Sequence, residues 1–174
     1  MPAELRRLPL LSLGLVSGAA LGYQVLLLRV FAIIQWHHLA YMVIGLALLG
    51  YGASGTALAL ASATVRRHAA ALYVWSILLF GVICLPAFLA AQALAFSPEE
   101  LLWRPSLGWR LVANYAVLAV PFFLEACAVG IALGARTERA GRLYAADLCG
   151  AAQASLLALR TLYVPQPAHG LALM

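Results

Sequence analysis

Five long apolar runs dominate the sequence and restrict its fold more than any other feature. Each is long enough to cross a hydrocarbon layer of about 30 Å as a helix, which takes roughly 20 residues. They occupy about residues 8–34, 39–63, 69–96, 111–135 and 143–164, and a short tail follows at 165–174. The sequence therefore predicts an all-α, polytopic transmembrane bundle of about five helices, built as a single domain over residues 1–174.

The composition agrees with a chain that faces lipid. Hydrophobic residues make up 65% of the sequence and charged residues 10%, whereas a soluble domain is about half apolar and about a quarter charged. Because such a small number of polar side chains cannot cover a water-facing surface, we expect the lipid bilayer to be the main partner. The net charge of +5 comes from arginines in short clusters rather than a broad basic face, which argues against nucleic acid.

The arginine clusters predict the orientation of the bundle. Arg6 and Arg7 precede the first run, Arg66 and Arg67 separate the second from the third, and three more arginines separate the fourth from the fifth. Cytoplasmic links carry the excess of basic residues. We therefore expect the N-terminus in the cytoplasm, the C-terminus outside, and a location in a bacterial cytoplasmic (inner) membrane.

The segment "GYGASG" at 50–55 has the spacing G-x-G-x-x-G of a dinucleotide-binding loop. Such a loop follows a strand and is exposed to a pyrophosphate. Gly50, however, lies about 11 helical residues into the second run, roughly 16 Å deep. A pyrophosphate does not bind in hydrocarbon, so we interpret these glycines as helix-packing residues.

Small residues four positions apart recur in most of the runs. In lipid, such stripes let helix backbones approach closely. The sequence predicts packing through these stripes, either within one bundle or between two copies. The expected packing residues are Gly14, Gly18, Gly22, Gly52, Gly130, Gly134 and Gly150.

Two carboxylates fall inside apolar runs. Glu125 lies near the middle of the fourth run, where an ionisable side chain is by default a functional hypothesis. It could relay protons or bind a cation, or it could be a neutral glutamic acid hydrogen-bonded to a neighbouring helix. Asp147 lies about one turn into the fifth run, where it could pair with an arginine or anchor the helix end.

Three polar residues of the first run complete the candidate intramembrane site. Arg29 lies near the outer end of that run, so its side chain could snorkel to the interface or pair inside the bundle. Tyr23 and Gln24 lie deeper. Helical depth argues against a direct bridge between Arg29 and Glu125. We predict no catalytic residue, no metal site and no cofactor, because neither a C-x-x-C pair nor a nucleophile–base arrangement is present.

Several segments together resemble the transmembrane part of the membrane-embedded spermidine synthase-like proteins. "SGAALGYQVLLLR" at 17–29 is similar to the first helix of that family, and the glycine-rich run at 50–55 matches its second helix. "PFFLEACAVGIALGA" at 121–135 and "GRLYAADLCGAAQASLLA" at 141–158 are similar to two later segments. The matching residues of the first and last segments are Ser17, Gly18, Tyr23, Gln24, Arg29, Tyr144, Ala145, Ala146, Asp147, Leu148, Gly150, Ala151 and Ala152.

The resemblance implies a membrane module that is not catalytic on its own. Members of that family usually continue into a soluble Rossmann-like domain related to aminopropyltransferases and methyltransferases, and this sequence has no counterpart of that domain. We therefore expect a module that anchors or serves a missing soluble partner. The alternative is a small transporter or channel subunit that acts as an oligomer with Glu125 as its coupling carboxylate, or a truncated product without activity.

Overall fold

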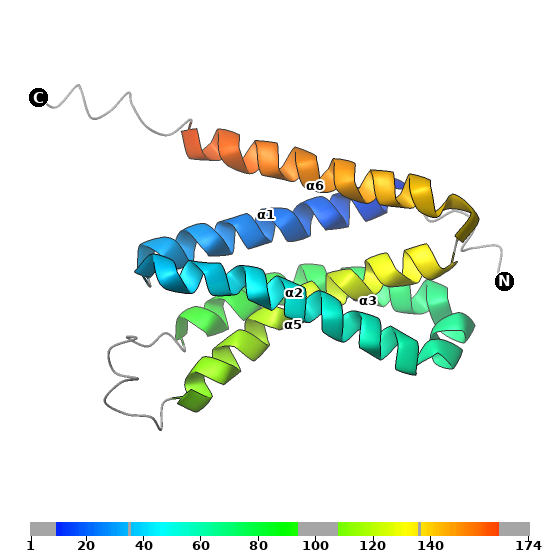
Figure 1. Cartoon of the computed structure of the whole chain (residues 1–174), viewed down its shortest axis with the longest axis horizontal. Coiled ribbons are helices and arrows are strands. Elements are labelled where there is room, and N and C mark those ends of the chain that lie inside the picture. Colours follow the sequence, from blue (N-terminus) through cyan, green and yellow to red (C-terminus); the bar gives the residue numbers. More distant parts are fainter. Residues whose placement is uncertain (1–9, 35, 94–107, 136, 164–174) are drawn as a thin grey trace, which may run out of the picture.

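The computed structural model describes residues 10–34, 36–93, 108–135 and 137–163, so the tail expected at 165–174 lies outside the described residues. The described chain is helical throughout, which confirms the all-α prediction (Figure 1). The elements are α1 (Leu10–Ile34), α2 (Trp36–Leu60), α3 (Ser62–Ala93), α5 (Gly108–Ala135), the short 3-10 helix η3 (Thr137–Arg139) and α6 (Ala140–Tyr163).

Four of the five long helices are long and apolar enough to cross a membrane. These are α1, α2, α3 and α5. The described part of α6 does not belong to this set, and it carries Arg142, Asp147 and Arg160 along 24 residues. The chain therefore has the helices of an integral membrane protein, and the crossing of the bilayer by α6 stays a prediction.

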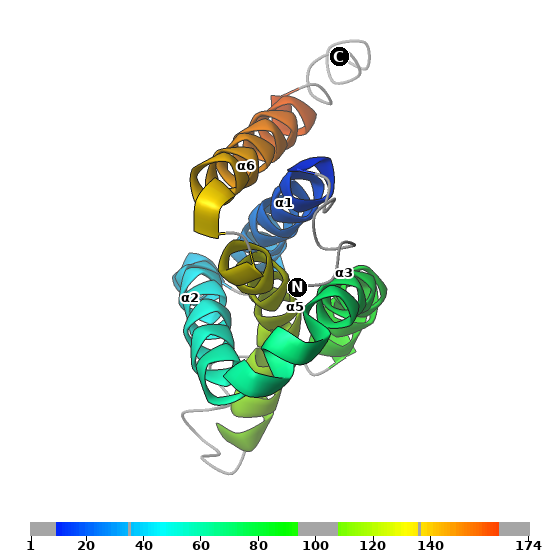
Figure 2. The same cartoon turned by 90° about the vertical axis from the view of Figure 1, so that its right-hand side faces the viewer.

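The five long helices alternate in direction, so the first and the last of them, α1 and α6, run parallel. Gly14 of α1 lies against Ala146 of α6, and Gly18, one turn further, lies against Ala154. Figure 1 shows α1 and α6 side by side, and Figure 2 shows α6 at the edge of the bundle with α5 near its centre. One end of the bundle thus holds the start of α1 and both the α2–α3 and α5–α6 connections. We call it the arginine end, because Arg66, Arg67 and Arg142 lie there.

The α2–α3 connection is a bent helix rather than a loop. The Ala61 amide donates to the Ala57 carbonyl and the Val65 amide to the Ala61 carbonyl, so the helical hydrogen bonds continue past the end of α2. The helix breaks at His68, where φ is −124° and ψ is 26°. Arg66 and Arg67, expected in a link, thus occupy the last turn before this break.

Two apolar clusters stabilise the bundle at different heights. The cluster nearer the arginine end includes Leu13, Tyr73, Ile131 and Leu143. The cluster further from it is built from the following residues: Leu27, Phe31, Val43, Leu46, Ala47, Ala91, Leu118 and Phe122. In lipid such clusters stabilise a bundle through close van der Waals packing between helices. The polar residues described below lie between these two clusters.

Candidate functional site: an acidic cavity between four helices

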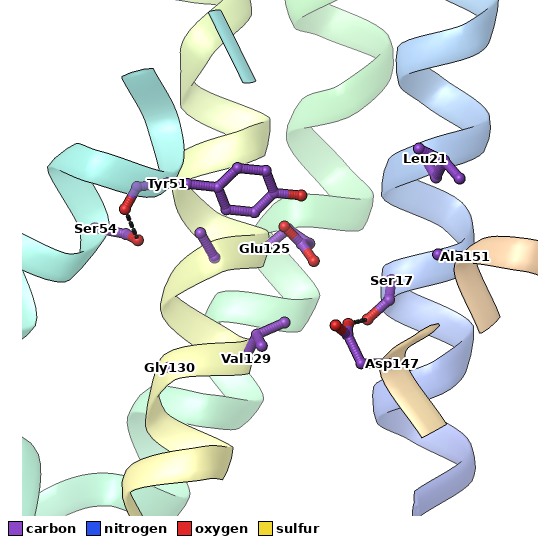
Figure 3. Close-up of a pocket in the computed structure, with 10 residues that line it drawn as sticks. Ser17, Leu21, Tyr51, Ser54, Glu125, Val129, Gly130, Asp147 and Ala151 are labelled. Carbon is purple, nitrogen blue, oxygen red and sulfur yellow. Dashed lines mark hydrogen bonds between the residues drawn. The ribbon is translucent and has the colours of Figure 1, made fainter. Parts of the chain in front are cut away.

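A partly open cavity of about 310 Å³ lies between α1, α2, α5 and α6 (Figure 3). Its lining residues are Ser17 and Leu21 of α1, Tyr51 and Ser54 of α2, Glu125, Ala126, Val129 and Gly130 of α5, and Asp147 and Ala151 of α6. Cavities that bind small molecules begin at about 300 Å³. This one is therefore large enough for a small organic group or for several water molecules.

Glu125 is the most deeply buried charged residue of the cavity. Its side chain is 2% exposed, and the Tyr51 hydroxyl points at the Glu125 carboxyl group (Figure 3). The Glu125 Oε2 atom has no hydrogen-bond partner among the described residues. Leaving a buried polar atom unsatisfied costs about 1–3 kcal/mol or more when it is charged. A proton or a bound cation would remove that cost.

Asp147 faces the same cavity from α6. Its Oδ1 atom accepts a hydrogen bond from the Ser17 hydroxyl, whose oxygen also lies 2.9 Å from the Leu13 carbonyl oxygen. A serine hydroxyl has a single hydrogen and cannot fully serve two acceptors. The contact with Ser17 places the Asp147 carboxyl group against α1 at the wall of the cavity.

The cavity thus brings together two carboxyl groups that sequence analysis treated separately. Glu125 and Asp147 both line it, and no lysine or arginine does so among the described residues. Two carboxyl groups without a basic partner attract positive charge. The arrangement is suited to hold at least one positive charge, as a proton or as a cation.

The other predicted polar residues lie elsewhere on α1. Arg29 is exposed and Gln24 is half-buried, while the Tyr23 ring packs on Phe122 with 5.7 Å between ring centroids. None of the three lines the cavity. Arg29 follows Ser17 by 12 residues, or roughly 18 Å of helix, which agrees with the expectation that it does not bridge to Glu125.

Four of the seven glycines predicted to pack helices lie close to another helix, and three have open surroundings. Gly14, Gly18 and Gly150 lie in the α1–α6 contact, where a Cβ atom on Gly150 would collide with the Gly14 backbone. A Cβ atom on Gly130 would lie 2.6 Å from Leu58 Cδ1. The described surroundings within 4 Å are open at the remaining three, which are Gly22, Gly52 and Gly134.

The "GYGASG" segment is part of the continuous helix α2 and forms no loop. A Cβ atom on Gly50 would lie 2.8 Å from Phe122 Cβ, so this glycine lets α2 and α5 approach closely. Gly52 and Gly55 meet nothing described within 4 Å. Between the glycines, Tyr51 and Ser54 face the cavity. The segment therefore contributes one close helix contact, at Gly50, and part of the cavity wall.

Sequence analysis missed Tyr51 and Ser54 as site residues, and it named Ser17 only through a resemblance. The distance of each residue from the end of its helix could have indicated which residues meet. Counted from the arginine end, Ser17 and Asp147 each lie seven residues inside their helices, roughly 10 Å deep, and Glu125 lies roughly 15 Å deep. Residues at similar depth were candidates to meet, but the direction in which each faces required the structure.

No group of three or more His, Cys, Asp or Glu side chains that could hold a metal ion occurs in the described part of the chain. Comparison of the chain with family models, with curated proteins and with solved structures finds no match.

Proposed function

We propose that this chain is a small membrane transport subunit in which Glu125 binds either a proton or a cation. The observation that carries the proposal is the buried Glu125 carboxyl group, whose Oε2 atom faces a partly open cavity without a protein partner among the described residues. Ionisable residues at membrane depth are costly and mark ion pathways and proton relays. A purely structural glutamate would be expected to satisfy both oxygens within the protein.

The arrangement of groups supports an exchange between the two ions. With a proton on Glu125 the cavity is less negative, and the cation is released. With the proton removed, the carboxylate attracts a cation, and the Tyr51 hydroxyl, which points at it, can donate a hydrogen bond to it. Exchange of this type couples the movement of one positive charge to that of another.

The test is proton flux in reconstituted vesicles. The wild-type chain is placed in phosphatidylcholine vesicles that contain a pH-sensitive dye and are acidic inside, and Na⁺, K⁺ or tetramethylammonium is added outside. Tetramethylammonium cannot cross lipid as a neutral amine. We expect at least one of these cations to dissipate the pH gradient, and Glu125→Gln to slow that flux by about tenfold or more, as for loss of a buried charged hydrogen-bonding group.

The control is Val82→Gln, because Val82 is 68% exposed on α3 and does not line the cavity. It should leave the flux unchanged. Absence of cation-dependent proton flux in the wild type, or equal flux in Glu125→Gln, would rule out the coupling role.

A second candidate is a membrane module of the spermidine synthase-like type that serves a soluble partner. It is favoured by the way the resembling segments contact each other. Ser17 of the first segment bonds Asp147 of the last, and Gly50 of the glycine-rich run lies against Phe122 of the "PFF" segment. Residues that match a family pattern and also meet in space are expected if they define a shared helical unit.

This second candidate is tested by the mass of the native product and by the proteins that copurify with it. Immunoprecipitation from native membranes, followed by intact mass spectrometry, should yield either a product larger than 18.5 kDa or a stable complex with a Rossmann-like protein. The isolated chain should not bind S-adenosylmethionine in isothermal titration. A native 18.5 kDa product without any soluble partner would count against the module.

A further inference from the structure

The cavity has a buried floor and an exposed rim. Ser17 and Glu125 are 4% and 2% exposed, whereas Tyr51 is 42% exposed. Ser17 of α1 and Glu125 of α5 form the floor, Tyr51 of α2 lies at the exposed side, and Ala151 of α6 is partly exposed. Access to Glu125 therefore leads past α2 and α6.

The bundle is closed along its axis on both sides of the cavity. Towards the arginine end, Leu13, Ile131 and Leu143 are buried in one apolar cluster. Towards the opposite end, Leu27 and Phe122 are buried in the other. Because apolar clusters close the cavity towards both ends of the bundle, its opening lies on the side of the bundle.

The side on which it opens is the space between α2 and α6. These two helices form no extensive contact with each other, although each packs along α1. Figure 2 shows them on the same side of the bundle, flanking α1 and α5. Asp147 and Glu125 lie roughly 10 and 15 Å from the arginine end, so the opening would face the acyl chains in a bilayer that these helices cross.

We propose that the cavity binds a membrane-dissolved amphiphile with a single primary ammonium head and one hydrocarbon chain, which enters laterally between α2 and α6. The proposal rests on the proposed function, because the same two carboxyl groups bind the head. An ammonium carries three donors, and Glu125 Oε2, Asp147 and the Ser54 hydroxyl supply acceptors of the cavity. The chain remains in the bilayer, which the ligand never has to leave.

The lining chemistry favours this class over two other ligands. A phospholipid would place its phosphate beside Glu125 and Asp147, where like charges repel. A bare divalent metal would need more ligands than the described residues provide in any one group. A singly charged ammonium on a hydrocarbon chain matches both the acidic floor and the apolar walls formed by Leu21 and Val129.

The experiment is photolabelling of the full chain in phosphatidylcholine nanodiscs. The probe is a long-chain primary amine that carries a diazirine in its hydrocarbon chain, and the labelled peptides are identified by mass spectrometry. We expect labels on α2 and α6 that dodecylamine displaces, whereas neither dodecanol nor ethylamine displaces them at the same concentration. Glu125→Gln should reduce labelling by about tenfold or more, as expected for loss of a charged hydrogen bond.

A second pair of variants tests the lateral entry without changing a carboxyl group. Ala151→Trp should fill the opening and reduce labelling severalfold. Val82→Trp places the same side chain on the lipid-facing surface of α3 and should leave labelling unchanged. Circular dichroism and size-exclusion chromatography establish that each variant retains its fold.

Three outcomes would overturn the proposal. Equal displacement by ethylamine would mean entry from water, equal displacement by dodecanol would mean that charge is not recognised, and undiminished labelling in Ala151→Trp would place the opening elsewhere. The vesicle assay keeps the two proposals apart. Selective labelling without cation-dependent proton flux would refute coupling alone, and flux without selective labelling would refute the amphiphile alone.

Discussion

The Ser17 hydroxyl donates a hydrogen bond to the Asp147 carboxyl group and so joins α1 to α6 across 130 positions of sequence. It does so beside a close backbone contact, where Gly14 faces Gly150. One helix pair therefore combines a small-residue contact with a polar bond at the same height. That height is also the height of the cavity, so the docking of α6 and the shape of the site depend on the same residues.

A double-mutant cycle should detect this bond as a coupling between Ser17 and Asp147. Residues in direct hydrogen-bonding contact show coupling energies of about 0.5–3 kcal/mol. We expect Ser17→Ala and Asp147→Ala to destabilise the bundle less than additively when combined. The measurement is unfolding in mixed detergent–dodecyl sulfate micelles followed by circular dichroism. Additive effects would show that the two side chains act independently.

Substitution of Gly150 should loosen the contact between α1 and α6. The added Cβ atom of Gly150→Ala would collide with the Gly14 backbone, which cannot rotate away. Overpacking of this kind costs about 1–3 kcal/mol. Gly22→Ala is the matched control, because no described atom lies within 4 Å of its Cβ position. If both variants melt at the wild-type temperature in detergent, the close α1–α6 contact is not needed for stability.

The glycines of "GYGASG" should differ in their tolerance of alanine. Gly50→Ala would place a Cβ atom 2.8 Å from Phe122 Cβ and separate α2 from α5, whereas Gly52→Ala meets nothing described within 4 Å. We expect a lower melting temperature for the first variant and little change for the second. A nucleotide-binding segment would instead lose a measurable ligand in both variants. Thermal melting in detergent with and without added NAD separates the two interpretations.

Glu125 should react with a membrane-soluble carbodiimide. Such reagents modify protonated carboxyl groups in apolar surroundings, and the Glu125 carboxyl group is buried beside a cavity that a small reagent can enter. We expect modification of Glu125, identified by mass spectrometry of peptides, and loss of that modified peptide in Glu125→Gln. Dodecylamine should protect Glu125 if it occupies the cavity. Modification of Glu138, which is exposed beside the arginine end, would not count as site labelling.

If α6 crosses the bilayer, its two ends should lie on opposite sides of the membrane. Arg142 and Arg160 are both exposed and lie near the first and last turns of the helix. After replacement of Cys84, Cys127 and Cys149 by alanine, we expect an impermeant maleimide to label Arg160→Cys but not Arg142→Cys in intact cells. This pattern also places the arginine end in the cytoplasm.

Labelling of both positions, or of neither, would show that α6 lies along the membrane. Trp109→Cys provides a positive control, because Trp109 is 63% exposed at the end opposite the arginine end.

Much of the fold could be predicted from sequence because the length of an apolar run is a property of one segment. The fourth run was expected at 111–135 and α5 spans Gly108–Ala135. The site could be predicted only in part. Glu125 was identifiable as an isolated carboxylate, but its meeting with Asp147 depends on the rotation of two helices about their axes. Sequence sets the depth of each residue along a helix and leaves that rotation open.

The glycines illustrate the same limit. Gly14, Gly18 and Gly22 form one stripe at equal spacing, yet only the first two lie against α6 in the described structure. Two helices that cross at an angle separate after a few turns, so a regular stripe extends further than the contact it serves. Gly50 shows the converse. It packs closely on Phe122, although Gly52 was the residue of this segment expected to pack against another helix.

The parallel pairing of α1 with α6 has a consequence for assembly. A chain emerges from the ribosome with its N-terminal helices first, and α6 is the last of the described helices to appear. Until it arrives, Ser17 and Glu125 lack the helix that forms the fourth wall around them. The acidic site is therefore completed only after the rest of the bundle has been inserted. Any error in the insertion of α6 would therefore affect the acidic site directly.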